Sequence, residues 1–381
     1  MVGPADGPQE RERLALRIAF DIAALWRGGA ERQTLEVASG LSELGHDVLL
    51  IVNKHAECFA EYIDRVQILE IGRTSRWDVR VVTDIRRALK AFNADVCVCV
   101  MFNASLWGRL AAASLGCRVV VAEHSTTGTA RTIERLTNIM LRNVTETVIA
   151  CAASQVDSLM RAGHQRQKIR VVRNGVDVRR FSRDIEAAKK LRAELNLPPD
   201  APIVMLVAAH RPEKRHDRFL QLIECLHATG LQVAGVMVGG GPLLVQTKAL
   251  AGASAAAGWL RVTGPMADMP TAYSAADVAV LLSDDIETFP LSFLEAQACE
   301  VPVVGMETGG VRETLLDGQT GFVVEQGDFD TMTSVLAALL TDLSRRREMG
   351  RAGRAYVEEH LSTEATVAGY LDVLERAAEG S

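Results

Sequence analysis

The sequence predicts an α/β protein of two doubly wound, Rossmann-like domains, each with a parallel sheet. Short runs rich in β-branched residues alternate with amphipathic segments of helical length, the pattern of a parallel sheet covered by helices. The alternation stops at Asn174-Gly175-Val176-Asp177 and at Pro198-Pro199-Asp200, then starts again. The length of 381 residues also exceeds the roughly 100 to 200 residues of one domain.

These breaks divide the chain into five segments. Residues 1–16 are interpreted as a flexible leader that lacks the apolar core of a signal peptide. Residues 17–175 form the first domain, residues 176–200 a linker and residues 201–360 the second domain. Residues 361–381 form a C-terminal helix that we expect to pack back toward the first domain.

Each domain is assigned its strands from the β-branched runs. The strands expected in the first domain are Arg17–Ile22, Asp47–Val52, Val66–Ile71, Asp95–Val100, Arg118–Glu123, Thr147–Cys151 and Ile169–Val172, with helices over Ala30–Leu44, Asp78–Phe92 and Thr132–Leu141. Those expected in the second are Ile203–Ala208, Val233–Val238, Leu260–Val262, Val278–Leu282, Val301–Val304 and Gly321–Val323, followed by helices over Asp328–Leu340, Leu343–Glu359 and Thr363–Ala378.

Composition places the chain among ordinary globular proteins. Hydrophobic residues make up 48% and charged residues 24%, and the longest apolar run, 96–102, is far shorter than the about 18 residues of a membrane span. The seven cysteines are scattered and form no C-x-x-C pair. This usage favours a reducing cytoplasm over a disulfide framework or a zinc site.

The charge is unevenly distributed along the chain. The formal net charge of −6 argues against a nucleic-acid partner. Residues 1–190, however, hold 28 Lys and Arg against 22 Asp and Glu, whereas residues 191–381 hold 14 against 26. Two explanations of this asymmetry stay open. One is drift in composition between the domains, and the other is an anionic partner of the first half.

The most informative stretch runs from Glu287 to Val304. It follows an apolar run, so its loop leaves the carboxyl end of a parallel strand, where open α/β sheets bind ligands. Thr288 as N-cap and Pro290 in the first turn predict a helix over Phe289–Cys299. Its free N–H groups would then face the crevice and bind an anion or hydroxyl groups.

Glu287 and Glu295 frame this stretch. Carboxylates are hydrogen-bond acceptors, and a sugar or ribose offers adjacent hydroxyl donors. Two glutamates eight residues apart are common in helices, so the spacing alone is weak evidence.

Taken together, the motifs resemble the donor-site signature of the retaining glycosyltransferases of family four, which have the GT-B fold. The resemblance covers about residues 17 to 375. The residues that carry it are Gly28-Gly29-Ala30-Glu31-Arg32, His124, Asn174-Gly175-Val176-Asp177, Pro212-Glu213-Lys214, Gly239 to Pro242, Glu287, Glu295, Pro302-Val303-Val304, Gly309-Gly310, Glu313 and Gly321.

The resemblance implies that the second domain binds a nucleotide sugar. Glu295 would accept hydrogen bonds from the ribose, and Glu287 would hold a sugar hydroxyl near the anomeric carbon. Backbone amides of Phe289, Leu291 and Ser292, beside Pro290, would complete the cradle; proline itself has no N–H to give.

Lys214 would pair with the diphosphate and stabilise the charge that develops as the nucleotide leaves. No metal or cofactor is then expected. The arginine that the family usually carries five residues before this lysine is Ala209 here, and Arg211 is the nearest candidate. Gly240 would also line the donor site.

From the first domain, which would bind the acceptor, Gly28 and Gly29 would face the diphosphate or acceptor across the cleft. His124 would contact the donor sugar near the reaction centre. No general-base role is assigned to it, because in these retaining enzymes the leaving phosphate takes the acceptor's proton on the same face.

The predicted activity is transfer of a hexose or N-acetylhexosamine from a nucleotide diphosphate sugar, with a UDP-sugar favoured over GDP-mannose. The acceptor would be a small molecule, a glycan or a lipid-linked sugar. An epimerase or hydrolase of the same fold, or a non-catalytic nucleotide-sugar-binding protein, are the alternatives.

A membrane contact through the basic first domain also stays open. The segment Arg131–Arg142 interleaves apolar and basic residues, as an interfacial helix would. The same pattern fits a helix packed on the sheet.

Overall fold

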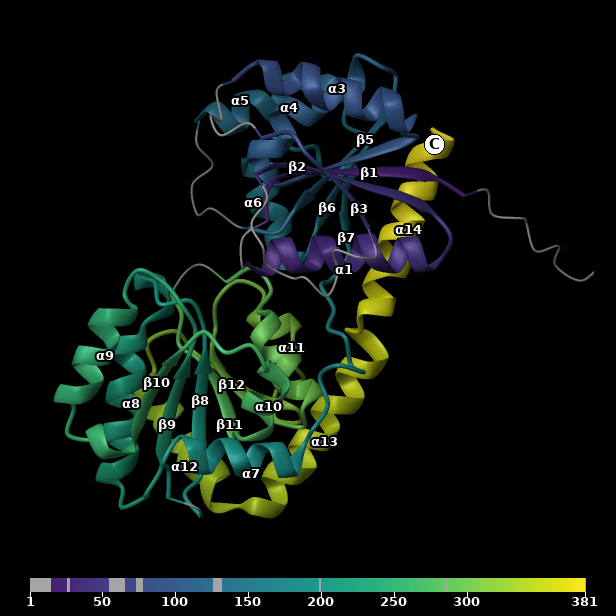
Figure 1. Cartoon of the computed structure of the whole chain (residues 1–381). Coiled ribbons are helices and arrows are strands. Elements are labelled where there is room, and N and C mark those ends of the chain that lie inside the picture. Colours follow the sequence, from purple (N-terminus) through teal and green to yellow (C-terminus); the bar gives the residue numbers. More distant parts are fainter. Residues whose placement is uncertain are drawn as a thin grey trace, which may run out of the picture.

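The computed structural model describes residues 15–25, 28–54, 66–72, 78–125, 132–198, 200–284 and 287–380. These residues form two α/β domains stacked one above the other (Figure 1). The predicted fold class is therefore confirmed. Residues 1–14 of the expected leader lie outside the described residues.

The first sheet is parallel throughout, in the order β3-β2-β1-β4-β5-β6-β7. Every strand predicted for this domain is present. The strands are β1 (Arg17–Ala24), β2 (Asp47–Lys54), β3 (Gln67–Glu70), β4 (Val96–Val100), β5 (Arg118–Glu123), β6 (Thr147–Ala150) and β7 (Ile169–Val171). The helices are α1 (Gly29–Glu43), α3 (Arg80–Phe92), α4 (Met101–Ala113), α5 (Thr132–Met140) and α6 (Val156–Arg161).

The second sheet is also parallel, in the order β10-β9-β8-β11-β12-β13. Its strands are β8 (Ile203–Val207), β9 (Ala234–Val238), β10 (Leu260–Gly264), β11 (Val278–Leu281), β12 (Val303–Met306) and β13 (Gly321–Val324). The helices are α7 (Ile185–Glu194), α8 (His216–Ala228), α9 (Leu244–Ala253), α10 (Met269–Ser274), α11 (Leu291–Ala298), α12 (Phe329–Thr341), α13 (Leu343–His360) and α14 (Thr363–Glu379).

Helices cover both faces of each sheet, which explains why the central strands are apolar at consecutive positions. All five residues of β4 and all four of β11 are buried. A strand that is covered on both faces cannot alternate apolar with polar side chains.

The segment that the sequence assigned to a linker, residues 176–200, contains α7. Asp184 caps this helix by accepting a hydrogen bond from the Ala187 N–H, at 2.9 Å. Ala188 and Leu191 join the core cluster of the second domain. Most of the segment is thus part of that domain's packing.

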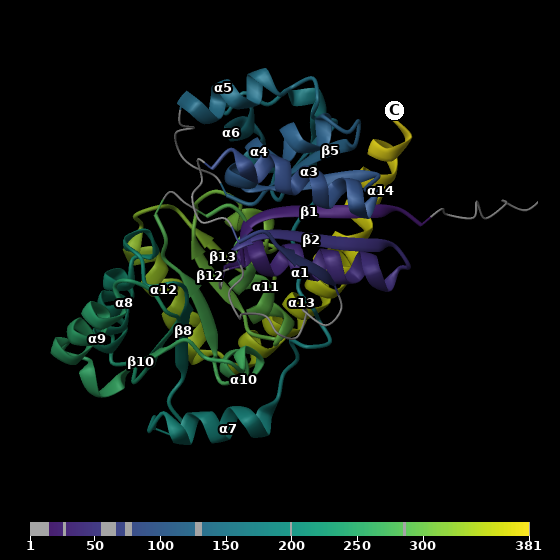
Figure 2. The same cartoon turned by 45° about the horizontal axis from the view of Figure 1, so that its top comes forward.

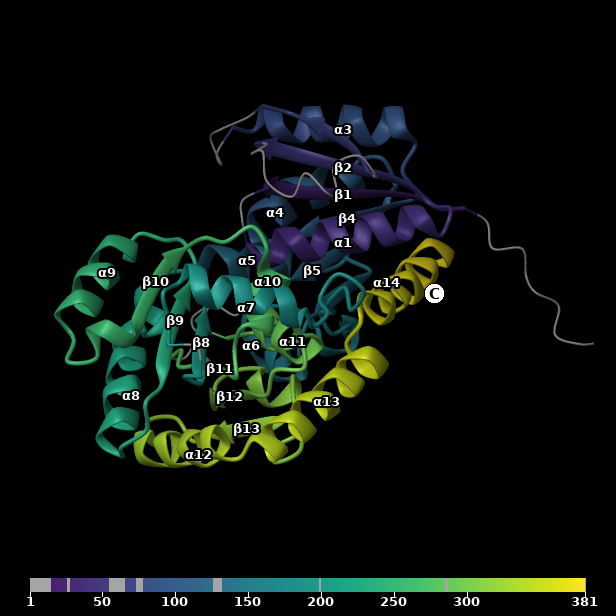
Figure 3. The same cartoon turned by 60° about the horizontal axis from the view of Figure 1, so that its bottom comes forward.

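The chain crosses between the domains twice, at neighbouring places. Val176 donates a hydrogen bond to the Leu361 carbonyl at 3.0 Å and accepts one from the Thr363 N–H at 3.1 Å. After the second crossing, α14 packs on the first domain, where Val367 and Leu374 are buried in its core. Figure 3 shows α12, α13 and α14 following one another along the molecule.

None of the helices in the described part of the chain is both long enough and apolar enough to cross a bilayer.

A buried carboxyl group lies in the middle of β1. Asp21 is fully buried, and neither of its carboxyl oxygens has a hydrogen-bond partner among the described residues. Burial raises the pKa of Asp21 to about 8. The folded protein therefore holds a proton that the unfolded chain has released above about pH 4.

The Asp21→Asn variant should lose less stability than the wild type as the pH rises from 6 to 8. A raised pKa in the folded state stabilises the protein at low pH, and this stability is lost as the pH rises through about 8. The loss amounts to roughly 1.4 kcal/mol per pH unit, and asparagine does not titrate. Urea unfolding at both pH values measures the difference. An equal pH dependence in the two proteins would contradict the assignment.

Candidate functional site

The loops after β8 and β11 meet where the strand order of the second sheet reverses. The crevice outside the carboxyl ends of the strands at such a point is where open α/β sheets bind ligands. Lys214 lies on the loop after β8 and Glu287 on the loop after β11. The Asp284 N–H donates to the Glu213 carbonyl at 3.0 Å, which joins the two loops.

Lys214 and Glu287 form an ion pair at this point. The Lys214 ammonium contacts Oε1 of Glu287, and the Ser283 hydroxyl donates to the same oxygen at 2.6 Å. Glu287 is 7% exposed, whereas the Lys214 side chain is 20% exposed. Two residues predicted from separate motifs are thus brought together, and part of the lysine side chain remains exposed.

The helix after Glu287 begins later than the sequence predicts. We expected Thr288 as N-cap of a helix over Phe289–Cys299, but α11 begins at Leu291 with Pro290 in the N-cap position. Pro290 has extended backbone dihedrals, and its carbonyl accepts the Phe293 N–H at 3.1 Å. The N–H groups of Leu291 and Ser292 therefore belong to the first turn and have no intrahelical partner.

Glu295 lies one turn into α11 and is only 5% exposed. Its Oε2 accepts a hydrogen bond of 2.6 Å from the Tyr273 hydroxyl. Its Oε1 forms an ion pair with Arg32, which lies on α1 of the first domain. Burial, and then the charge of Glu295, raise the pKa of Tyr273 well above its usual value, so the phenol remains a donor.

Gly29 begins α1 and lies against α11 of the second domain. Gly28 is the N-cap of the helix. A Cβ on Gly29 would lie 3.2 Å from Cδ1 of Leu291, so the first domain approaches the second closely at this point. Figure 2 shows α1 between the first sheet and α11.

Arg211 and Gly240 lie on adjoining loops of the second domain. The Gly240 carbonyl accepts the His210 N–H at 2.7 Å, so the glycine loop after β9 abuts the loop that carries Arg211. Arg211 is exposed, and its positive charge acts on Glu31 of α1, where it opposes the rise in pKa that burial causes. The charge of Arg211 is thus felt at α1 of the first domain.

His124 follows β5 and lies beside α14. The Tyr370 hydroxyl is 3.5 Å from its Nε2. Burial lowers the pKa of His124 to about 4, so the ring is neutral at physiological pH. A neutral imidazole can donate or accept a hydrogen bond, but with this pKa it is a poor base.

Glu313, one of the residues that carry the resemblance, reaches the first domain. Its two carboxylate oxygens accept the N–H groups of Ala153 and Ser154, each at 2.8 Å. Arg173 approaches the same carboxylate at 3.7 Å. Glu313 therefore holds the two domains together.

Sequence reasoning missed three residues of this site: Arg32, Tyr273 and Ser283. Arg32 belongs to a quoted motif but received no role, because its partner is 263 positions away in the other domain. Tyr273 and Ser283 stand in no motif, so only the folded arrangement reveals them.

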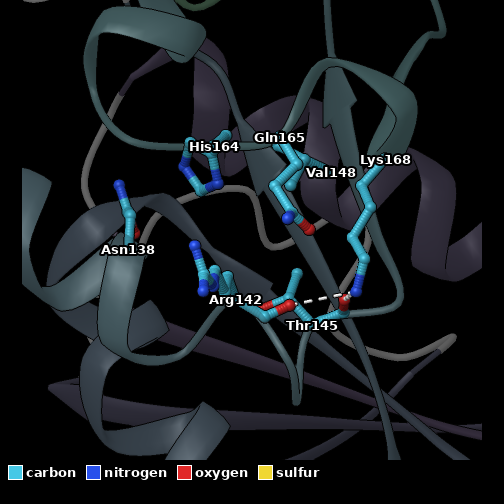
Figure 4. Close-up of a pocket in the computed structure, with 7 residues that line it drawn as sticks. All are labelled: Asn138, Arg142, Thr145, Val148, His164, Gln165 and Lys168. Atoms are coloured by element: carbon cyan, nitrogen blue, oxygen red, sulfur yellow. Dashed lines mark hydrogen bonds between the residues drawn. The ribbon is translucent and has the colours of Figure 1, made fainter.

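A small cavity lies elsewhere in the first domain and includes none of the predicted site residues. It measures about 10 Å³, roughly the space of a single water. Its lining residues are Asn138, Arg142, Thr145, Val148, His164, Gln165 and Lys168 (Figure 4). Among the described residues, no group of three or more His, Cys, Asp or Glu side chains is arranged to hold a metal ion.

The fold and the arrangement of the two domains are those of GT-B glycosyltransferases. A glycosyltransferase from Rickettsia africae has a TM-score of 0.85 at 18% identity, over 96% of this chain and 99% of that one. The Anabaena protein HepE, solved with UDP and glucose, has a TM-score of 0.83 at 17% identity, over 94% and 99%. Identities this low show the fold alone.

Two family models match consecutive parts of the chain. Residues 27–180 match "Glycosyltransferase Family 4" and residues 187–356 match "Glycosyl transferases group 1". The two matches together cover most of the chain and identify it as a group 1 glycosyltransferase. A GDP-mannose-dependent alpha-(1-6)-phosphatidylinositol monomannoside mannosyltransferase of Mycolicibacterium smegmatis is 35% identical over 47% of this chain and 49% of the relative. The chain thus spans about half the length of this curated relative.

Proposed function

We propose that the protein transfers a sugar from a nucleotide diphosphate sugar to an acceptor hydroxyl, with retention of the anomeric configuration. The observation that carries the proposal is the Lys214–Glu287 pair at the switch point of the second sheet. Lys214 would supply a cation for the diphosphate and Glu287 a carboxylate for the sugar, and the two side chains are in contact. Family membership supports the same reaction.

In the proposed reaction, Lys214 stabilises the negative charge that grows on the leaving diphosphate. Glu287 holds the same donor by a hydroxyl group of its sugar. His124, with its pKa of about 4, is a poor acceptor for the proton of the incoming hydroxyl. In the proposal, the leaving phosphate therefore accepts that proton, on the same face of the sugar as the new bond. Independence from metal ions remains a prediction of this scheme.

For the donor we place GDP-mannose first, because the name of the mycobacterial relative specifies it. The UDP-sugar that the sequence favoured is the competitor, and the name of the HepE structure specifies UDP. A nucleotide present at 100 times its dissociation constant should stabilise the protein by about 2.7 kcal/mol. We expect GDP-mannose to raise the melting temperature more than UDP-glucose does in a thermal-shift assay. A larger shift with UDP-glucose would instead make a UDP-sugar the preferred donor.

The Lys214→Ala and Glu287→Gln variants should each lower the rate of sugar transfer by about 100-fold or more while staying folded. Lys189→Ala is the matched control, since Lys189 is an exposed lysine paired with Glu186 on α7. Product formation from the nucleotide sugar and an acceptor measures the rate. Wild-type rates in both variants would contradict the site assignment.

The alternatives are separated by the products. An epimerase or a hydrolase converts the donor without an acceptor, so incubation with donor alone reveals either activity. A non-catalytic binding protein would bind the donor tightly and turn over none of it with any acceptor.

We further propose that the acceptor is carried by an anionic membrane, which the first domain contacts through α5. This helix is inverted relative to an ordinary surface helix: Thr137 and Asn138 are buried, whereas Leu136 and Met140 are 54% and 80% exposed. Asn138 is held inside by Arg109, which donates to it at 2.7 Å. The apolar side chains are therefore available to a lipid surface.

Leu136→Glu with Met140→Glu should abolish binding to anionic vesicles at low salt, because charge on the apolar face opposes insertion. Val245→Glu is the control, since Val245 is 80% exposed on α9 of the second domain. Co-sedimentation with phosphatidylglycerol vesicles measures the bound fraction. Failure of the wild type to bind at low salt would exclude this contact and leave the transfer reaction unaffected.

A further inference from the structure

The ion pair between Arg32 and Glu295 joins the two domains through the carboxylate that the family resemblance assigns to the ribose. Glu295 is 5% exposed, so no ligand reaches it in this arrangement of the domains. One oxygen accepts from Tyr273 and the other contacts Arg32. The structure thus shows a donor-site carboxylate that is closed off by the protein itself.

The two partners of Glu295 differ in origin. Tyr273 lies on α10 of the same domain, so it stays with Glu295 however the domains move. Arg32 comes from α1 of the first domain, so it would separate from Glu295 if the two domains moved apart. Any exchange of partners at Glu295 must therefore occur at the oxygen that Arg32 occupies.

A second carboxylate, that of Glu36, also lies near Arg32. The Nε of Arg32 lies 3.5 Å from Oε1 of Glu36, one turn further along α1. Because Glu36 is in the same helix, this interaction survives the separation of the domains. The guanidinium would therefore keep a negatively charged neighbour, Glu36, after Glu295 is released.

Resting on the proposed function, we propose that Arg32 competes with the donor ribose for Glu295. Its N–H groups would occupy the carboxylate oxygen that the ribose hydroxyls need. Donor binding transfers Glu295 from Arg32 to the ribose, while Tyr273 keeps the carboxylate oriented. Arg32 is thus a positioning residue that sets the affinity for the nucleotide.

The competition predicts that loss of Arg32 tightens nucleotide binding. When only a fraction of the protein is free to bind, the apparent dissociation constant rises in inverse proportion to that fraction. Arg32→Met should lower the dissociation constant for GDP or UDP, both titrated by calorimetry, by about threefold or more. Arg32→Gln serves as a second variant, and Arg32→Lys, which keeps the charge, should restore weak binding.

Arg173→Met is the matched control. Arg173 also pairs across the domains, with Glu313 at 3.7 Å, but it does not touch Glu295. Its loss should leave nucleotide affinity unchanged. A gain equal to that of Arg32→Met would show that domain loosening alone is responsible and would overturn the proposal.

The 2′,3′-dideoxy nucleotides identify the atoms involved. If Arg32 competes with the ribose hydroxyls, the gain in affinity should appear with GDP or UDP and vanish with the dideoxy analogue. A gain of the same size with both would overturn the proposal, and so would unchanged or weaker binding of GDP and UDP by Arg32→Met and Arg32→Gln.

Glu295→Gln separates this proposal from the proposed function. Wild-type nucleotide affinity in that variant would remove the ribose assignment itself. Weakened binding in Glu295→Gln, without tightening in Arg32→Met, would instead keep the ribose assignment and reject the competition.

Discussion

A carboxylate that is removed from water needs a positive charge or hydrogen-bond donors, and this need shapes the site. Glu287 and Glu295 are both nearly buried. Glu287 finds its cation, Lys214, within its own domain, whereas Glu295 finds Arg32 in the other domain. The first pair can therefore form in the second domain alone. The second pair forms only when the two domains meet, so it makes the arrangement of the domains part of the site.

Helix α1 connects that pair to the hinge. One residue after Arg32, the Gln33 side chain donates to the Gly175 carbonyl at 2.9 Å and accepts the Gly175 N–H at 3.0 Å. Gly175 lies in the first crossing between the domains, tight against the backbone of Ser362 in the second crossing. A side chain at Gly175 would collide there. Because Arg32 and Gln33 are adjacent on one helix, a change at the two crossings would also shift the guanidinium relative to Glu295.

Local pattern predicted the strands and the switch-point loops because apolar runs and breaks are written in neighbouring residues. The predicted start of α11 was wrong. Threonine is a common N-cap residue, which favoured Thr288, but the helix begins only after Pro290, whose backbone is extended. For α5, the amphipathic pattern did not say which face is buried. That depends on Arg109, a buried arginine whose partner Asn138 must turn inward. Arg32 and Tyr273 are linked to Glu295 only by tertiary folding, so no local signal identifies them.

The opposite charges of the two halves of the chain also acquire a structural meaning. The excess of arginine and lysine in residues 1–190 suggested an anionic partner outside the protein. Two of these arginines, Arg32 and Arg173, in fact pair with carboxylates of the acidic half, at Glu295 and Glu313. Part of the asymmetry therefore serves the attraction between the domains. In the proposed reaction, a bound donor would bring further negative charge near Lys214 and Arg211, so the diphosphate and the Glu295 carboxylate would draw on separate cations.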